Sequence, residues 1–254
     1  MITVTANSFH EKLHIEGDEI TLNGPPSFLT GNIFISNRDP ETLFIRDLPL
    51  VHPGNTEGRQ MVQQTFKLLT SLKAGEEKMH RVSHSLSPST PPGIYESTIL
   101  VGGTEKKVKM IVQSNIEIDM YPLTFHFDGV APGKSYDTQI TFTNSGNIPF
   151  KIPDTKHVNT FDEDYLCRAT SLAIREKGGE GYMATMDQLT KNVHDEMAGW
   201  AMVNLEESGR VVQPGETIQL HFKLTLPENV DPGRDYFGSV RLWNKMLNYN
   251  IKSQ

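Results

Sequence analysis

Nine histidines and a single cysteine are the residues of this chain that could bind a metal ion or act as a nucleophile. His10 and His14 are four residues apart, and so are His80 and His84. On a helix this spacing would serve one ion, but the surrounding residues favour strands, where four residues separate two side chains by about 13 Å. We therefore expect no metal site. A copper centre of the β-sandwich type is also not expected, because the late cluster of Cys, His and Met that it needs is missing.

A thiol nucleophile is the second chemistry to consider. Cys167, His194 and Asp195 lie in one segment and could meet as nucleophile, base and orienting group. A lone cysteine on an apolar helix face is more typical of packing, and we expect that role for Cys167. The chain has no Gly-x-Ser-x-Gly elbow, phosphate loop or dinucleotide fingerprint. The sequence thus predicts no catalytic residue, no cofactor and no enzyme.

Charge and composition exclude further classes. The formal net charge of −7 and the lack of a basic stripe argue against nucleic acid as a partner. No apolar run reaches the length of about 18 residues that a membrane-spanning helix needs. The first residues do not resemble a signal peptide, so we expect a cytoplasmic protein if Met1 is the native start. A secreted or periplasmic protein is the alternative if a signal peptide has been removed.

The elements that would position any site follow a repeated pattern. Residues 75–101 and 215–242 both open with Gly-Glu, both carry a Pro-Gly pair, and both then reach a tyrosine, Tyr95 or Tyr236. Each tyrosine begins a strand-like alternation of apolar and polar residues. We expect each tyrosine to pack in the sandwich and to fix a neighbouring turn with its hydroxyl group, as in β-sandwich corners.

The repeat continues upstream. Residues 30–51 and 136–158 both alternate with period two, turn at "SNRDPE" or "TNSGNIP", and resume as a strand. We expect Gly146 in the second turn to hold a positive φ. The fold class is therefore predicted as mainly all-β, with two tandem immunoglobulin-like antiparallel β-sandwiches of shared strand order. The expected domains are residues 1–115 and 116–254.

"FTNSGNIPFKI" is similar to the strand turn of bacterial and archaeal immunoglobulin-like modules of the CARDB and NPCBM-associated type. It also resembles modules of cilia-associated and major-sperm-protein-like proteins. The segments "PPGIY" and "DPGRDY" look like the second half of such modules. The resemblance implies a sandwich that acts as a spacer, adaptor or partner-binding module.

The two copies differ in length at one place. From the turn asparagine to the following Gly-Glu, the second copy is about 33 residues longer than the first. The extra segment predicts two helices, so we expect a helical hairpin inserted at about residues 160–204. Asp162 is predicted to cap the first helix and Gly178 to end it, and Thr185 with Gln188 matches a capping box for the second. In the first copy, residues 55–72 are predicted as an irregular loop and a strand.

One stripe of this insertion is a candidate partner-binding surface. Its members recur at spacings of three and four, which places them on one face of an amphipathic helix. They are Met186, Leu189, Val193, Met197 and Trp200. Packing on the sandwich or on the sister helix is the simpler interpretation. The alternative is that the methionine-rich end with the tryptophan contacts a partner protein.

The sequence as a whole predicts a non-enzymatic protein-protein interaction module, either an adaptor or a structural subunit of a larger assembly. Its partner would be another protein or a second copy of the chain. A carbohydrate or cell-surface accessory module is the first alternative, and it would need an exposed aromatic platform. An enzyme with its site in the helical insertion is the second alternative.

Overall fold

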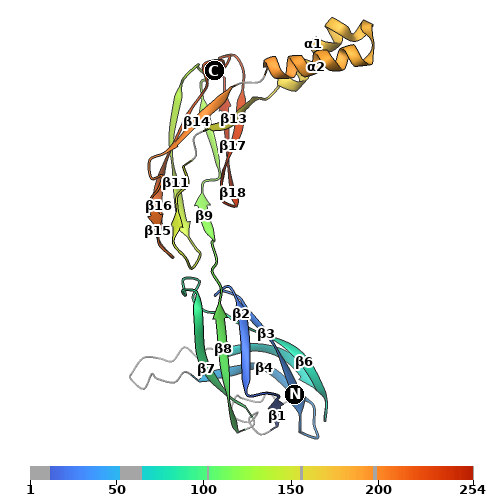
Figure 1. The fold of residues 1–254 in the computed structure, drawn as a ribbon, viewed down its shortest axis with the longest axis vertical. Coiled ribbons are helices and arrows are strands. Elements are labelled where there is room, and N and C mark those ends of the chain that lie inside the picture. Colours follow the sequence, from blue (N-terminus) through green and yellow to red (C-terminus); the bar gives the residue numbers. More distant parts are fainter. Residues whose placement is uncertain (1–11, 52–64, 102, 155–156, 197–198, 254) are drawn as a thin grey trace. The chain divides into compact units, whose positions relative to one another are not determined.

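The structure is a computed structural model that describes residues 12–51, 65–101, 103–154, 157–196 and 199–253 (Figure 1). The chain forms two compact units. The first comprises Met1–Glu117 with Ser145–Ile148, and the second comprises Ile118–Asn144 with Pro149–Gln254.

Eight strands make up the described part of the first unit. They are β1 (Leu13–Ile15), β2 (Glu19–Gly24), β3 (Leu29–Asn37), β4 (Leu43–Val51), β5 (Thr65–Leu72), β6 (Glu77–His84), β7 (Gly93–Val101) and β8 (Thr104–Val112).

The second unit contains ten strands, two α-helices and a short 3-10 helix in its described residues. They are β9 (Ile118–Tyr121), β10 (Thr124–Asp128), β11 (Ser135–Asn144), β12 (Phe150–Lys151), β13 (His157–Asp162), α1 (Tyr165–Lys177), η1 (Gly178–Glu180), α2 (Tyr182–Glu196), β14 (Trp200–Leu205), β15 (Val211–Val212), β16 (Thr217–Thr225), β17 (Tyr236–Leu242) and β18 (Lys245–Lys252).

Strand pairing follows the same order in both units. In the first unit β1 pairs with β3, followed by β6, β5, β4, β7 and β8, and β8 pairs in parallel with β2. In the second unit β9 pairs with β11, followed by β16, β14, β13, β17 and β18, and β18 pairs in parallel with β10. Each unit thus forms one series of eight strands with the neighbours of an immunoglobulin-like sandwich, and in the first unit β2 also pairs with β3. The predicted fold class and the predicted sharing of strand order are confirmed.

The alternating residues supply the cores. Along β11, Tyr136, Ile140 and Phe142 are buried on one face, while the alternate residues Asp137, Gln139 and Thr141 are on the other face. Along β3, Ile33 and Ile35 are buried in the same manner. Period-two alternation buries one face of each strand and leaves the other face in contact with water.

Both copies close the end of a strand with the same hydrogen bonds. In the first unit the amide of Asn37 donates to the carbonyl of Glu76 at 3.0 Å, and the amide of Gly75 donates to the carbonyl of Asn37 at 3.1 Å. In the second unit the amide of Asn144 donates to the carbonyl of Glu216 at 3.0 Å, and that of Gly215 donates to the carbonyl of Asn144 at 2.8 Å. We call each set an Asn-Gly-Glu clasp.

Side chains complete these two clasps. Asn37 and Asn144 are both buried, and each donates from its side-chain amide to a backbone carbonyl across the loop. Gly75 and Gly215 hold φ values of 68° and 78°, a region that favours glycine. The repeated Gly-Glu pairs of the sequence therefore mark a turn that must bind a buried asparagine.

The two tyrosines play the part expected of them. Tyr95 is partly buried at the start of β7 and donates from its hydroxyl to the carbonyl of Pro91 at 2.9 Å. Tyr236 is buried at the start of β17, and its hydroxyl accepts from the amide of Asp231 at 2.9 Å. In each unit a tyrosine thus fixes the turn that precedes its strand, and the prediction is confirmed.

The expectation for Gly146 is wrong, because its φ is not in the positive region. The turn that contains it groups with the first unit. There a Cβ atom on Gly146 would lie closer to the carbonyl oxygen of Asn115 than van der Waals contact allows, and 2.8 Å from the amide nitrogen of Glu117. Close approach of two backbones, rather than backbone conformation, explains the glycine.

We predict that Gly146→Ala lowers the free energy of unfolding by about 1–3 kcal/mol, because the new methyl group must push two backbone segments apart. Gly179→Ala is the matched control, since a Cβ atom there would meet nothing within 4 Å. Urea denaturation followed by circular dichroism measures both variants. Equal stability of the two variants would contradict this account of the turn.

Candidate protein-interaction surface

The insertion is a pair of antiparallel helices between β13 and β14 of the second unit (Figure 1). Helix α1 begins after Asp164, whose side chain makes no capping hydrogen bond. Asp162 does not occupy the cap position that the sequence predicted, but its carboxylate accepts from the amide of Asp164 at 2.9 Å. Gly178 ends α1, as predicted. The chain then reverses at Gly181, which has a φ of 99°.

The predicted capping box of the second helix is wrong. Helix α2 begins at Tyr182, so Thr185 lies in its first turn rather than at its cap. The Thr185 hydroxyl lies 3.0 Å from the carbonyl oxygen of Gly181 and 3.1 Å from that of Lys177. Gln188 donates instead to Glu176 of α1 at 2.9 Å. These side chains join the two helices and do not cap one of them.

Small and polar side chains fill the contact between the helices. Ala169 and Ala173 are the buried residues of α1, and Asn192 is the buried residue among the side chains described for α2. The Asn192 side-chain amide donates to the carbonyl of Ala169 at 3.3 Å, and its oxygen accepts from Gln188 at 2.9 Å. The hairpin is therefore held by close backbone approach and hydrogen bonds, with little apolar volume between its helices.

The five residues of the predicted stripe do not form one helix face. Met186, Leu189 and Val193 lie on α2, as predicted, and Met186 is 37% exposed. Trp200 is the first residue of β14, so its place on the helix is a wrong prediction. Met197 lies outside the described residues. The helical spacing of three and four residues thus ends before β14, where the chain continues as a strand with alternation of period two.

Helix α1 extends the stripe on α2. Ala169 and Ala173 face α2, and about 100° of rotation per residue then places Leu166 and Ile174 on one flank of α1. The same construction places Tyr182 and the three stripe residues on one flank of α2. Because the helices run antiparallel, both flanks lie on the same side of the hairpin. This apolar hairpin face consists of Leu166, Ile174, Tyr182, Met186, Leu189 and Val193.

Exposure separates the apolar hairpin face from a packed core. Leu166 is 52% exposed, Ile174 59% and Tyr182 75%, whereas Leu189 and Val193 of the same face are half-buried. Large apolar side chains that gather on one side of an element and remain in water are typical of a contact surface. The sequence analysis missed these three residues, although Leu166 and Ile174 are eight residues apart, a spacing that keeps two side chains near the same side of a helix.

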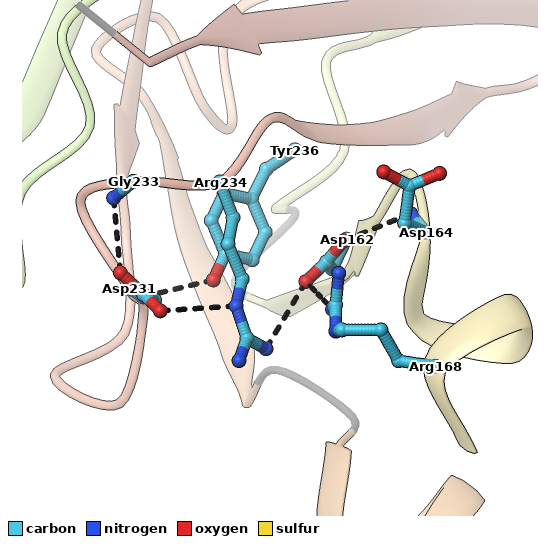
Figure 2. A network of polar contacts seen from close by, with 7 residues as sticks. All are labelled: Asp162, Asp164, Arg168, Asp231, Gly233, Arg234 and Tyr236. Atoms are coloured by element: carbon cyan, nitrogen blue, oxygen red, sulfur yellow. Dashed lines mark hydrogen bonds and ion pairs between the residues drawn. The ribbon is translucent and has the colours of Figure 1, made fainter. Parts of the chain in front are cut away.

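A buried carboxylate connects the hairpin to the sandwich. Asp162 at the end of β13 is 2% exposed. It forms an ion pair with Arg168 of α1 and a second with Arg234 of the loop before β17, the latter at 3.3 Å (Figure 2). Burial of a carboxylate is unfavourable unless cations and hydrogen-bond donors satisfy it, and here two arginines and one backbone amide do so.

The loop that supplies Arg234 is itself fixed. The carboxylate of Asp231 pairs with the guanidinium of Arg234 at 3.0 Å and accepts from the amide of Gly233 at 2.9 Å. The hydroxyl of Tyr236 accepts from the Asp231 amide, so the corner of the sandwich and the base of the hairpin share one network (Figure 2).

Aromatic rings pack around the same base. Phe161 of β13 stacks on Tyr165 of α1 with ring centroids 5.9 Å apart, and it lies 5.7 Å from the ring of Phe237. Trp200 projects from the outer face of the neighbouring strand β14 and is 61% exposed. Its cross-strand partner on β13 is Asn159.

A third cluster lies beside the base network. Lys252 near the end of the chain reaches Glu163 at 3.1 Å and Asp235 at 2.9 Å. Hydrogen bonds from Lys252 and Ser253 lower the pKa of Asp235 to about 2. The last strand is thereby connected to Glu163, which follows the buried Asp162, and to Asp235, which follows its partner Arg234.

The residues considered for nucleophilic chemistry are not assembled into a site. Cys167 is exposed on α1, so its expected role in packing is wrong. His194 and Asp195 are exposed neighbours whose side chains lie 3.5 Å apart. In the described part of the chain no hydrogen bond joins the cysteine to either of them.

The histidine pairs do not assemble either. His80 and His84 lie on β6, where burial lowers the pKa of His80 and the ring of His84 packs against Phe66. His10 lies outside the described residues. A different cluster, Glu206, Glu207 and His221, has the spacing of metal ligands.

An ion pair accounts for that cluster without a metal. The ring of His221 lies 2.6 Å from the carboxylate of Glu207, which also accepts from the His221 amide at 2.8 Å. The hydrogen bond to Glu207 raises the pKa of His221. Although burial acts in the opposite direction, the hydrogen bonds from His221 lower the pKa of Glu207 overall.

No protein-family model and no curated protein matches this chain. The resemblance to CARDB and NPCBM-associated modules is therefore not supported at the level of a family. Among the described residues, no helix is long and apolar enough to cross a membrane.

Three of the solved structures that are similar to this chain are the following. A protein of unknown function from Porphyromonas gingivalis W83 is 10% identical over 95% of this chain and 99% of its own, with a TM-score of 0.26. The CupB2 chaperone from Pseudomonas aeruginosa is 8% identical over 95% and 100%, with a TM-score of 0.26. Titin domains z1z2, solved in complex with telethonin, are 9% identical over 96% and 98%, with a TM-score of 0.26. At these values the assignment of the fold rests on the strand pairing described above.

We predict that Asp162→Asn destabilises the second unit by about 2 kcal/mol, because two arginines lose a buried counter-charge. This is below the cost for a fully buried pair, since the side chains of Arg168 and Arg234 are 30% and 32% exposed. Asp187→Asn, on the exposed surface of α2, is the matched control. Urea denaturation measures both, and equal stabilities would show that the network contributes nothing.

The Glu207–His221 pair predicts a pH dependence with two limits. The pKa of His221 in the folded protein lies above its ordinary value of 6.5. Its contribution to the stability of the fold is therefore complete below pH 6.5 and is lost as pH rises through the folded pKa. The folded pKa of Glu207 lies below 4.5, so its stabilisation is lost as pH falls through that pKa. The pair therefore stabilises most between about pH 4.5 and 6.5. NMR titration of the His221 ring should show its pKa fall in Glu207→Gln, and an unchanged pKa would refute the pairing.

Proposed function

We propose that this chain is a protein-protein interaction module that acts as an adaptor or structural subunit of a larger assembly. In this proposal residues 1–115 and 116–254 are its two domains, and the helical hairpin of the second is its binding device. The apolar hairpin face carries the proposal. Leu166, Ile174 and Tyr182 are more than half exposed on one side of an element that the sandwich strand order does not require.

The comparison between the two copies supports this role. Both units complete the same strand order and the same Asn-Gly-Glu clasp, and the second adds about 33 residues that place two helices between the strands β13 and β14. An addition that the fold does not need is a common place for function. The hairpin is also anchored firmly at its base by the ion pairs of Asp162, which would hold the face in a fixed orientation toward a partner.

The physical character of the face favours a protein as the ligand. Methionine and tyrosine side chains are well suited to irregular protein surfaces, because methionine adapts its shape and tyrosine adds a rigid contact area. Most charged side chains of the helices, among them Arg175, Asp187 and Lys191, fall on the opposite flank. The face therefore offers little to an ionic ligand.

We predict that a variant in which a short Gly/Ser loop replaces residues 165–196 keeps both sandwiches folded and loses its partner. The change in loop length costs little, about 0.6 kcal/mol for each doubling. Loss of Arg168 leaves Asp162 paired with Arg234 alone, so the second unit should be less stable than in the wild type but still folded. β13 and β14 remain intact, since they end and begin outside the replaced segment. Circular dichroism and affinity purification from the source organism measure folding and binding.

A point variant separates loss of the face from loss of the hairpin. Leu166→Gln with Ile174→Gln removes apolar contact from exposed positions, where substitutions usually change stability by less than about 0.5 kcal/mol. Leu69→Gln, at a residue of the first unit that is 80% exposed, is the matched control. Unfolding of the second unit on deletion would identify the hairpin as core, and undiminished binding by the double variant would refute the proposed site.

The carbohydrate alternative is kept because of one observation. Trp200 is 61% exposed on a flat strand face, and Asn159 lies directly across the strand pair. An aromatic ring beside an amide could stack on a sugar and bond to its hydroxyl groups. Binding that survives deletion of the hairpin but is lost in Trp200→Ala would favour this alternative.

A further inference from the structure

The apolar hairpin face lacks a covering layer within the hairpin itself. Among the side chains described for the two helices, Ala169, Ala173 and Asn192 are the fully buried ones, and the larger Leu172, Leu189 and Val193 are only half-buried. Helices of 13 and 15 residues are close to the length at which isolated helices are marginal in water. Burial of the larger side chains on the exposed face would add the stabilisation that the small contact residues do not supply.

The geometry of the face is that of one half of a four-helix bundle. It has two antiparallel rows of side chains, one led by Leu166 and Ile174 on α1 and one by Tyr182 and Met186 on α2. Two helices that are joined by a short connection and are apolar along a shared flank can pack against a second such pair in a four-helix bundle. Helix α1 has 13 residues and α2 has 15, so a second hairpin of equal length would cover both rows from end to end.

The charge distribution is compatible with two identical faces in contact. Lys177 is the charged side chain of α1 nearest this flank, and it pairs within its own hairpin with Glu180 at 2.8 Å. The charges of Arg168 and Arg175 lie on the other flank of α1. A face with almost no net charge does not repel its own copy, whereas a strongly charged partner would gain nothing from it.

We propose that the occupant of the apolar hairpin face is the hairpin of a second copy of this chain, so that two molecules pair through a four-helix bundle with two-fold symmetry. The proposal rests on the proposed function, because it requires the hairpin to be the binding device. In a two-fold interface the same patch serves both molecules, so Ile174 and Leu166 of each copy meet the corresponding rows of the other.

The area of the apolar hairpin face sets the expected affinity of dimerisation. Each helix is about 20 Å long and about 10 Å across, so the face covers about 400 Å² of flat area. Stable interfaces bury about 800 Å² on each partner, and smaller ones are weak or transient. We therefore expect dimerisation with a Kd in the micromolar range, about 10–100 µM.

Sedimentation velocity of the full chain from about 1 to about 200 µM tests the proposal across that range. The wild type should shift from monomer to dimer. Ile174→Glu should weaken dimerisation by more than about tenfold, because the symmetry brings a charge from each copy into the apolar contact. Leu69→Gln, which is exposed in the first unit, should dimerise as the wild type does.

The single cysteine provides a second measurement. Cys167 is exposed on α1, next to Leu166, and takes a nitroxide label without any new cysteine. Pairing through the hairpins should give a narrow distribution of short distances between the two labels in a pulsed electron paramagnetic resonance experiment. A broad or long distance, or full dimerisation of Ile174→Glu, would overturn the proposed contact.

The outcomes distinguish the two proposals. A wild type that stays monomeric over the whole range overturns self-pairing, but the proposed function stands if the double variant Leu166→Gln with Ile174→Gln still loses a different protein partner. If the double variant still binds its protein partner and the wild type is monomeric, both proposals fail.

Discussion

The ion pairs of Asp162 are the interaction that attaches the helical hairpin to the sandwich of the second unit, and the orientation of the hairpin depends on them. This carboxylate is 2% exposed, and it binds one arginine from the helix α1 and one from the loop before β17. Without these cations a buried negative charge would be strongly unfavourable. Their presence makes the base of the hairpin part of the sandwich, while the helices themselves contribute only a thin layer of small side chains. Firm attachment and an unfilled apolar face are the two properties expected of a binding device.

The sandwich beneath the hairpin is made rigid by repeated local chemistry. Each copy closes a strand end with a buried asparagine, a glycine of positive φ and a glutamate carbonyl, and each fixes a turn with a tyrosine hydroxyl. The polar groups of these contacts are hydrogen-bonded to one another within the chain. The feature in which the second copy differs is the helical hairpin, and the proposed function places binding there.

The sequence predicted what depends on neighbours in the chain. Period-two alternation around Ile140 and Phe142 predicted strands and a core, and the spacing of Met186, Leu189 and Val193 predicted a helix. It failed for Trp200, where the alternation of the following strand had begun. It also failed for Gly146 and for the partners of Asp162, because Asn115 and Arg234 approach from distant parts of the chain. Leu166 and Ile174 could be assigned to the apolar hairpin face only once the antiparallel pairing of the helices was known.

Hydrogen exchange of the backbone amides tests most directly whether the hairpin is an appended device that a partner must cover. At low protein concentration we predict that α1 and α2 exchange much faster than the central strands β11 and β16, because little apolar burial protects the helices. Their exchange should slow when the face is covered, while the strands stay unchanged. Helix amides that exchange as slowly as those of β11 and β16 in the uncovered protein would show that the hairpin belongs to the core, and would contradict the account.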